Sequence, residues 1–266
     1  MLRLRTRMPE QNSLRSSLLE DAGFRHAFFT RHGGVSQGPY SSLSFSQAAG
    51  DDPDHVRENL RRAAETLGVE PGRLYFLSQV HGTATVTLDG SESFDQVLHS
   101  QGDALLARRS DLACGVRTAD CVPILVGDRA SGAALAIHAG WRGAVRGVVS
   151  EAIAELRKQS GEAGDLIAAI GPHISLAAFE VGQDVAEELS RACPLPIVDR
   201  SFGPRPHVNL RAIVRWQLEQ LGLGAAAIDD VEGCTVSEPE RFFSYRRDGK
   251  HSGRHLSAIV PLAKSR

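Results

Sequence analysis

The sequence contains one clear strand–helix–strand unit within a chain whose other strands mostly follow one another directly. The apolar run 133–138 leads into a helix predicted from about Arg142 to Gln159, and the apolar run 166–170 follows that helix. A unit of this kind places two parallel strands in one sheet with the helix packed across it. Because strand follows strand elsewhere, the pattern favours an α+β fold with mixed sheets over a doubly wound parallel sheet.

Apolar runs predict the other strands, and apolar stripes between capping residues predict the other helices. The predicted strands are 24–29, 74–78, 84–88, 113–117, 122–126, 133–138, 166–170, 228–236 and 256–262. The further predicted helices run from Pro53, after the N-cap Asp52, to Gly68, around Val185 and Leu189, and from Asn209 to Gly222. No repeat or long linker divides the chain, so we predict an N-terminal tail of residues 1–22 and a single domain over residues 23–266.

The composition argues against several classes of partner. Charged residues make up 23% of the 266 residues and the formal net charge is −2, so no overall field attracts nucleic acid. No stretch of the sequence approaches the ~18 apolar residues that a membrane-spanning helix needs. The four cysteines are widely spaced, without a C-x-x-C pair, which is typical of free thiols in a reducing compartment. We therefore expect a cytoplasmic protein that binds neither nucleic acid nor membrane. The sequence does not determine the oligomeric state, and we favour a monomer.

Three short segments each place a side chain capable of binding metal beside the end of a predicted strand. They are Ser78–Gly82 with His81, Thr118–Cys121, and Ile137–Gly143 with His138. Two imidazoles and one thiolate form a three-ligand set for zinc, with the fourth position open as in catalytic zinc sites. A buried histidine beside a glycine-rich turn is the alternative for His138, and we favour the metal because all three ligands are available. If the three side chains converge, the protein is a zinc enzyme.

Polar residues next to these ligands are candidates for supporting roles. Asp120 precedes Cys121 and can orient a ligand histidine, act as a general base, or cap a turn. The amide of Gln79 is either a hydrogen-bond partner in the pocket or a surface group. The sequence leaves both choices open.

Four arginines lie in glycine-rich or aromatic contexts that suit recognition of an anion. Arg142 lies at the start of the helix after His138, where free backbone N–H groups favour phosphate. Arg31 precedes a double glycine, and Arg246 and Arg247 follow the aromatic run 242–245. Ordinary surface salt bridges are the alternative for each arginine taken singly.

At these motifs the sequence resembles the YfiH-like purine nucleoside phosphorylase family, formerly called multicopper polyphenol oxidase or laccase domain. The resemblance covers residues 28 to about 262. It rests on the blocks FFTRHGGVS, GDDP, SQVHG, GDAL, TADCVPILV, AIHAGWRG, GPH, FEVG and FFSYRRDG, in that order.

The resemblance implies an α-β-β-α sandwich of mixed sheets in a single domain. It implies one zinc ion held by His81, Cys121 and His138, with copper as the less favoured metal. It also implies phosphorolysis of adenosine, inosine, guanosine and methylthioadenosine, with adenosine deaminase activity, so that purine nucleosides and phosphate are the expected partners. The chain carries Ser44 where relatives usually have Asn, and His173 where they often have Cys, which places substrate preference in question.

Other functions fit parts of the sequence. A copper-dependent polyphenol oxidase of the laccase type needs many histidines, several as H-x-H pairs, and none of the ten histidines forms such a pair. A metal-free hydrolase would use Cys121 as nucleophile with His81 or His138 as base. A factor that edits peptidoglycan precursors is the remaining alternative.

Overall fold

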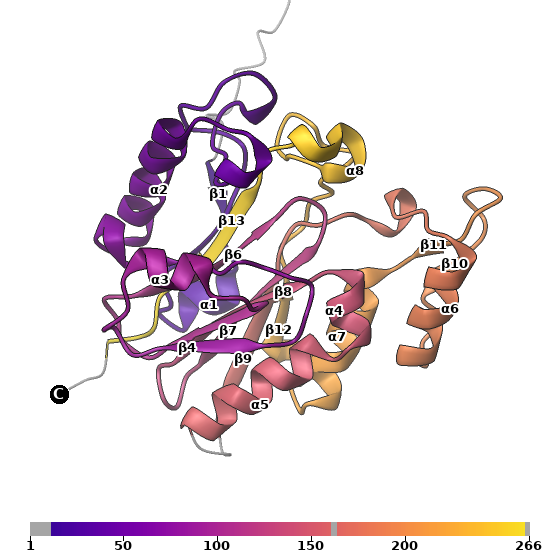
Figure 1. Cartoon of the computed structure of the whole chain (residues 1–266). Helices are drawn as coiled ribbons and strands as arrows, with labels where there is room; N and C mark the ends of the chain where they lie inside the picture. Colours follow the sequence, from indigo (N-terminus) through magenta and orange to yellow (C-terminus); the bar gives the residue numbers. More distant parts are fainter. Residues whose placement is uncertain (1–11, 161–163, 264–266) are drawn as a thin grey trace, which may run out of the picture.

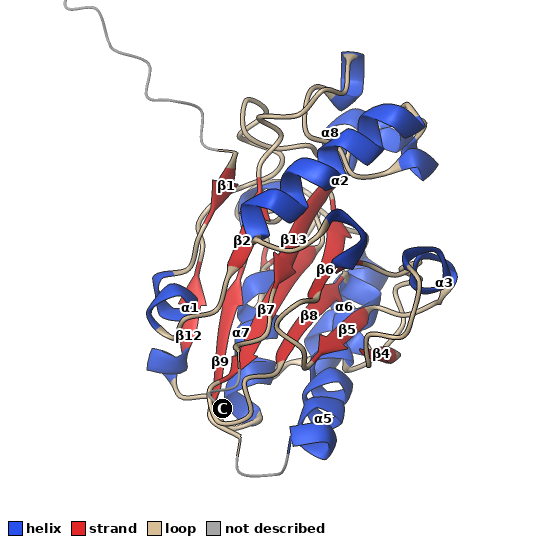
Figure 2. Cartoon of the chain, turned by 90° about the vertical axis from the view of Figure 1, so that its left-hand side faces the viewer, coloured by secondary structure: helices blue, strands red, loops and turns tan. Residues whose placement is uncertain are grey.

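Two mixed β-sheets pack face to face and carry helices on both outer faces. The computed structural model describes residues 12–160 and 164–263. In Figure 1, helix α2 lies on one side of the strands, whereas α4, α5 and α7 lie on the other, and Figure 2 shows the strands from a perpendicular direction. The described helices are α1 (Ser17–Asp21), α2 (Pro53–Leu67), α3 (Phe94–His99), α4 (Trp141–Val145), α5 (Val148–Ser160), α6 (Gln183–Ala192), α7 (Leu210–Gln220) and α8 (Tyr245–Asp248).

Each large sheet mixes parallel and antiparallel neighbours. The five-stranded sheet has the order β1 (Ser13–Leu14), β2 (His26–Phe29), β13 (His255–Ile259), β6 (Ala113–Thr118) and β3 (Leu74–Tyr75). The six-stranded sheet has the order β12 (Ile228–Asp230), β9 (Leu166–Ile170), β7 (Val122–Asp128), β8 (Ala134–Ala139), β5 (Ala104–Ala107) and β4 (Thr85–Leu88). A separate hairpin-like pair joins β10 (Val198–Asp199) to β11 (His207–Val208). The pairs β6–β3, β12–β9 and β5–β4 are parallel and the other neighbours are antiparallel.

The core forms three layers because successive side chains of a strand point to opposite faces. On β7, Ile124 packs toward the helices of the six-stranded sheet, whereas Leu125 packs between the two sheets. A third apolar layer joins the outer face of the five-stranded sheet to α2. Strands buried on both faces appear in the sequence as continuous apolar runs. This layering confirms the expected α+β sandwich.

The predicted strand–helix–strand unit is present with one modification. β8 and β9 both run antiparallel to β7, which lies between them, so β8 and β9 are parallel to each other. The connection contains two helices, α4 and α5, instead of the single predicted helix. Gly147 separates them at φ +83°, a left-handed conformation that favours glycine.

Several other elements differ from the prediction. α2 begins and ends as expected, since Asp52 accepts a hydrogen bond from the backbone N–H of Asp54, and Gly68 adopts a left-handed conformation. The predicted strand 228–236 ends at Asp230, and β5 was not predicted. Of the predicted tail, residues 12–22 carry β1 and α1, and residues 1–11 lie outside the described residues.

One connection between the two sheets determines where the site forms. β6 belongs to the five-stranded sheet and β7 to the six-stranded sheet, and only residues 119–121 join them. Two of the predicted site residues, Asp120 and Cys121, lie in this link. The C-terminal end of β8 is beside it, because Val122 pairs with Ala139 and Pro123 with His138.

Candidate metal centre

His81, Cys121 and His138 converge as the sequence predicts. One ligand atom from each residue lies within 4.8 Å of the other two. The Sγ atom of Cys121 is 3.8 Å from Nε2 of His81, and the two imidazole rings meet edge to face with centroids 4.9 Å apart. His138 is buried, while His81 is the most exposed of the three. Two nitrogen donors and one sulfur donor in this arrangement can hold a transition metal ion.

The backbone around the cluster is adapted to bring the three ligands together. His81 adopts a left-handed conformation at φ +58°, which is uncommon for a residue with a side chain. Gly140 approaches the cluster so closely that a Cβ atom there would lie 2.6 Å from Cδ2 of His81 and 3.1 Å from Sγ of Cys121. Only glycine at this position leaves room for both ligands.

Asp103 connects two of the ligands and was not predicted. Its buried carboxylate accepts hydrogen bonds from the backbone N–H groups of Val80, His81 and Gly82 at 3.3, 3.0 and 2.7 Å. The same carboxylate lies 2.7 Å from Nδ1 of His138. Donation from Nδ1 directs Nε2 of His138 toward the cluster as a lone-pair donor, which is how carboxylates orient metal-binding histidines. Asp103 therefore supports both histidines at once.

The electrostatics of the cluster favour a thiolate beside an imidazolium when no metal is bound. Burial alone would raise the pKa of Cys121, but the neighbouring charge and hydrogen bonds of His138 and His81 outweigh it and lower that pKa. Burial would lower the pKa of His138, but Cys121 and Asp103 outweigh it and raise that pKa. A thiolate is the form of cysteine that binds metal and acts as a nucleophile.

The hydrogen bonds of Asp120 go to partners other than the ligand histidines. Its carboxylate accepts a hydrogen bond from the Thr235 hydroxyl at 2.6 Å and another from the backbone N–H of Arg246 at 2.6 Å. The second contact holds the first turn of α8. Among the roles considered from the sequence, these contacts correspond to the cap, and Asp103 occupies the position of the orienting acceptor. Asp120 also lines the cavity beside the cluster, so its role as a general base stays a prediction.

A cavity of about 590 Å³ opens beside the cluster and contains some of the predicted site residues. All three cluster residues line it, and so do Gln79, Arg142 and Arg246. The Gln79 amide is fixed, because it donates to the carbonyl of Arg117 and accepts from the N–H of Arg117, both at 2.7 Å.

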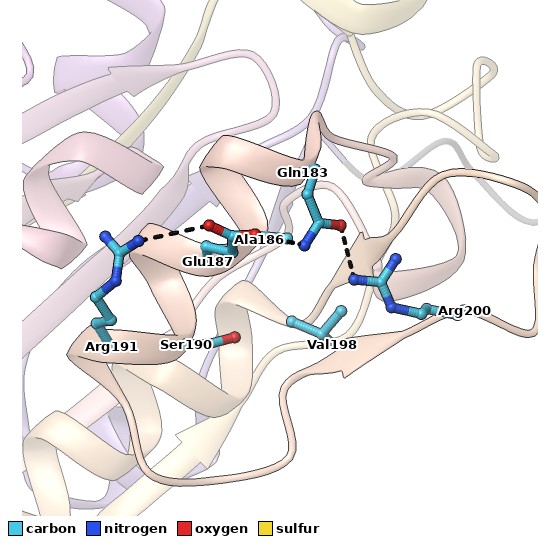
Figure 3. Close-up of a pocket in the computed structure, with 7 residues that line it drawn as sticks. All are labelled: Gln183, Ala186, Glu187, Ser190, Arg191, Val198 and Arg200. Carbon is cyan, nitrogen blue, oxygen red and sulfur yellow. Dashed lines mark hydrogen bonds and ion pairs between the residues drawn. The ribbon is translucent and has the colours of Figure 1, made fainter.

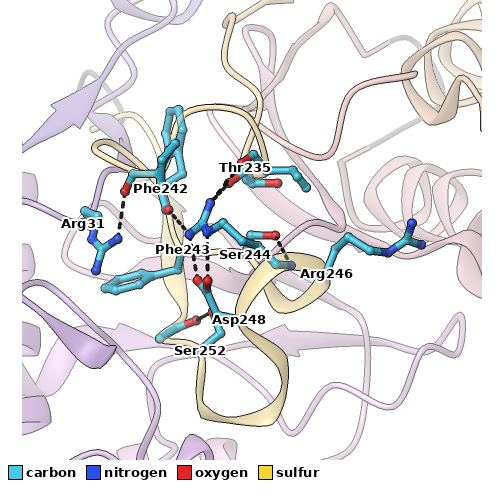
Figure 4. Close-up of polar contacts among 12 residues, drawn as sticks. Arg31, Thr235, Phe242, Phe243, Ser244, Arg246, Asp248 and Ser252 are labelled. Carbon is cyan, nitrogen blue, oxygen red and sulfur yellow. Dashed lines mark hydrogen bonds and ion pairs between the residues drawn. The ribbon is translucent and has the colours of Figure 1, made fainter. Parts of the chain in front are cut away.

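Arg31, Ser44 and Arg247 are not among the residues that line this cavity. Arg31 donates to the carbonyls of Ser41 and Pro239, both at 2.8 Å. Ser44 is completely buried. Arg247 donates to three backbone carbonyls and pairs with Asp248 at 2.7 Å, within the polar network around Thr235 and Phe242 drawn in Figure 4.

Two residues that differ from the family pattern also lie away from the cavity. His173 is buried, and its Nδ1 lies 2.7 Å from the carbonyl oxygen of Gly171. Neither His173 nor Ser44 is among the residues that line the cavity.

Two cavity arginines were missed by the sequence analysis. Arg117 lies near the end of β6, and Arg254 directly precedes β13. Both line the cavity. The only signal in the sequence is a charged residue at the end of an apolar strand, which is too common to identify a site.

A second hollow, of about 520 Å³, lies on the surface between α6 and β10 (Figure 3). Its polar side chains bond to one another, since Gln183 contacts both Glu187 and Arg200. None of the cluster residues lines it. The chemistry of the described residues therefore concentrates in the first cavity.

Within residues 12–160 and 164–263, no helix is both long and apolar enough to cross a membrane. All four cysteines are unpaired, as the sequence predicts.

Comparisons with known proteins give a consistent result over almost the whole chain. The model of the family described as multi-copper polyphenol oxidoreductase laccase matches residues 25–261. A purine nucleoside phosphorylase of Bacteroides thetaiotaomicron is 35% identical over 254 residues, which cover 92% of this chain and 94% of that protein. A purine nucleoside phosphorylase of Streptomyces coelicolor is 37% identical over 229 residues, which cover 85% and 91%.

Solved structures show the same fold. The Neisseria meningitidis protein NMB0706 superimposes with a TM-score of 0.80 at 35% identity, covering 95% of this chain and all 100% of that one. YlmD from Geobacillus stearothermophilus superimposes with a TM-score of 0.86 at 29% identity, covering 97% and 98%.

Proposed function

This chain belongs to the YfiH-like family, whose model is described as multi-copper polyphenol oxidoreductase laccase, and on that basis we propose that it is a zinc-dependent purine nucleoside phosphorylase. Relatives that match most of its length carry the name purine nucleoside phosphorylase. The observation that carries the proposal is a three-ligand cluster that opens into a cavity lined by arginines.

The donor set fits zinc. Two imidazoles and a thiolate suit zinc, and His138 has its second nitrogen held by a carboxylate, as histidine ligands of zinc usually do. When bound, zinc supplies a Lewis acid that polarises an oxygen ligand or lowers the pKa of bound water. Copper, which the family description suggests, is the alternative metal. Among the described residues this cluster is the only group of three metal-capable side chains, whereas a multicopper oxidase needs several copper sites.

In phosphorolysis, an oxygen of phosphate forms a bond to C1′ of the ribose while the bond from C1′ to the purine nitrogen breaks. The electron pair leaves with the purine, which takes up a proton. The sugar becomes positively charged in the transition state, so a phosphate held beside it stabilises that state. Arg142 and Arg246 line the cavity and would add positive charge that attracts phosphate to it. Asp103 keeps His81 and His138 in the geometry that metal binding requires.

We further propose that the same cavity accepts adenosine, inosine, guanosine and methylthioadenosine, and that it deaminates adenosine. Deamination needs water in place of phosphate, and both reactions would then use the same metal. We expect the enzyme to act in the cytoplasm as a monomer.

A metal-free cysteine hydrolase is the second candidate, because Cys121, His138 and Asp103 are also ordered as a nucleophile, a base and a carboxylate that orients the base. Alkylation of the protein by iodoacetamide separates the two. If zinc is bound, added zinc protects the thiol and chelation removes activity. If Cys121 is instead the nucleophile of a metal-free hydrolase, chelation of metal ions leaves the enzyme activity intact.

Product analysis with adenosine tests the main proposal. The zinc-loaded protein is incubated with adenosine in the presence and absence of phosphate, and the products are separated. Adenine with ribose 1-phosphate indicates phosphorolysis, and inosine indicates deamination. Absence of both products, with inosine, guanosine and methylthioadenosine equally inert, would refute the proposal and favour the peptidoglycan-editing alternative.

A further inference from the structure

One guanidinium group reaches the cavity from β6 and a second from the residue directly before β13, the strand that pairs with β6. In the β6–β13 ladder, Arg117 lies opposite Leu256, and Arg254 comes two residues before Leu256 in the sequence. Side chains two residues apart in an extended chain point to the same face, and diagonal neighbours across a ladder are within reach of long side chains. Both arginines line the cavity that contains the His81–Cys121–His138 cluster.

Neither guanidinium forms an ion pair with an Asp or Glu of the described residues. Arg117 makes only long contacts to the carbonyls of Phe45 and Leu77, at 3.4 and 3.2 Å, and stacks on the ring of Phe76 at 4.4 Å. Arg254 donates from one nitrogen, Nη1, to the carbonyls of Ser252 and Gly253 at 2.6 and 3.0 Å. Its Nε and Nη2 donate to no acceptor in the part of the chain that the structure describes.

Among the described residues Arg117 has no acidic partner, whereas the negative charges of Asp120 and Cys121 lie near Arg254 and oppose the effect of burial on its pKa. Burial, together with the positive charge of Arg254, lowers the pKa of Arg117 to about 10, and burial also lowers the pKa of Arg254. Asp120 is near Arg254, but its two oxygens already accept hydrogen bonds from Thr235 and Arg246. An anion with several oxygens would satisfy the remaining donors and relieve the repulsion.

We propose that Arg117 and Arg254 together form the binding site for the oxygen atoms of inorganic phosphate in this cavity. The other cavity arginines are less suited to this task. Arg142 and Arg246 are exposed and stack on the rings of Trp141 at 4.4 Å and Phe179 at 5.5 Å, whereas Arg117 and Arg254 are half-buried. Arg117 is held in place by stacking, so its donors are oriented before the anion arrives. The role in phosphorolysis rests on the proposed function, whereas the anion site itself does not.

The test compares Arg117→Gln, Arg254→Gln and the charge-retaining Arg254→Lys with wild type, using the full-length, zinc-loaded protein. Arg57→Gln is the matched control, because Arg57 is an exposed arginine on α2 whose partner is Asp54. Phosphate affinity is measured by calorimetry with inorganic phosphate alone, and the melting temperature of each variant establishes that it is folded. In parallel, KM for phosphate and KM for inosine are determined separately.

We expect each Gln variant to weaken phosphate binding by at least about tenfold, since it loses a charged hydrogen-bond donor, and Arg254→Lys to recover part of that loss. The KM for phosphate should rise by the same factor while the KM for inosine changes by less than about threefold.

Two results distinguish failure of this inference from failure of the proposed function. If wild type and both Gln variants bind phosphate equally, the assignment to Arg117 and Arg254 is wrong even when phosphorolysis is observed. If wild type binds phosphate through these arginines but shows no phosphorolysis, the anion site stands and the proposed function falls.

Discussion

The cavity and the adjoining segment of residues 235–248 use the same residue types for opposite purposes. Arg247 satisfies its guanidinium entirely within the protein, through three carbonyl oxygens and Asp248. Arg254, seven positions later, lines the cavity, and its Nε and Nη2 atoms have no acceptor in the described residues. The two arginines differ in the hydrogen-bond acceptors that surround them. Nearby acceptors, more than residue type or motif context, therefore decide whether an arginine stabilises the fold or is available to a ligand.

We expect the largest loss of activity from the removal of Cys121, one of the three candidate metal ligands in the cavity. Cys121→Ala deletes the thiolate, so we expect loss of stoichiometric zinc and of all turnover while the protein stays folded. Zinc content by mass spectrometry and far-UV circular dichroism provide the measurement. Full phosphorolysis by this variant would show that the metal lies elsewhere and that Cys121 is not a ligand available in the cavity.

Asp103 has both a structural role and a role in the candidate site. Its carboxylate accepts hydrogen bonds from the backbone of residues 80–82, and it orients His138. Asp103→Asn should lower zinc affinity by roughly 10- to 100-fold, since loss of a carboxylate behind a ligand histidine has effects of that size. Competition with a chelator measures the affinity. Unchanged affinity would mean that the His138 tautomer does not depend on Asp103.

Arg247→Gln tests the segment of residues 235–248, in which the guanidinium group stabilises the fold. It removes hydrogen bonds from a charged donor to the carbonyls of Thr235 and Phe242, so the free energy of unfolding should fall by about 2–3 kcal/mol. Urea denaturation measures this loss. The KM for phosphate should match that of wild type, and a selective rise in that KM would show that Arg247 contacts the anion after all.

The comparison extends to buried histidines. His138 has charged partners, whereas burial lowers the pKa of His173 to about 4, and the Nδ1 atom of His173 bonds to the backbone carbonyl of Gly171. A folded pKa below the unfolded value of about 6.5 means that the unfolded chain binds the proton first, so stability falls as the pH drops from about 6.5 toward 4.

At pH 5 this single residue should cost on the order of 1–2 kcal/mol of unfolding free energy relative to pH 7. His173→Cys removes the titrating group and should flatten that part of the profile, as measured by urea denaturation at both pH values. An identical profile for the two proteins would show that His173 does not contribute.

The sequence predicted those features that have a local signature. Apolar runs predicted the buried strands, and Asp52 with Gly68 predicted both ends of α2. Each metal-capable side chain lay beside a predicted strand end, so their convergence could be expected. β5 was missed because four apolar residues after Asp103 also fit a turn, and β1 and α1 because their residues are largely polar.

The supporting residues could not be predicted because their roles depend on contacts between distant segments. Asp103 meets His138 across a separation of 35 residues. Arg31 and Arg247 have motif contexts that suggest anion binding, but their carbonyl partners appear only in three dimensions. Arg117 and Arg254 become neighbours only when β6 pairs with β13.

Because a link of only three residues joins β6 to β7, the relative position of the two sheets affects the geometry of the cavity. Arg117 and Arg254 move with one sheet and His138 with the other, so a small slide of the sheets would change the gap between anion and metal. If metal and phosphate bind as proposed, side chains packed between the sheets, such as Cys114 and Leu125, would influence the distance between them. Drift in catalytic rate among related proteins can accordingly arise from interior residues that never touch a substrate.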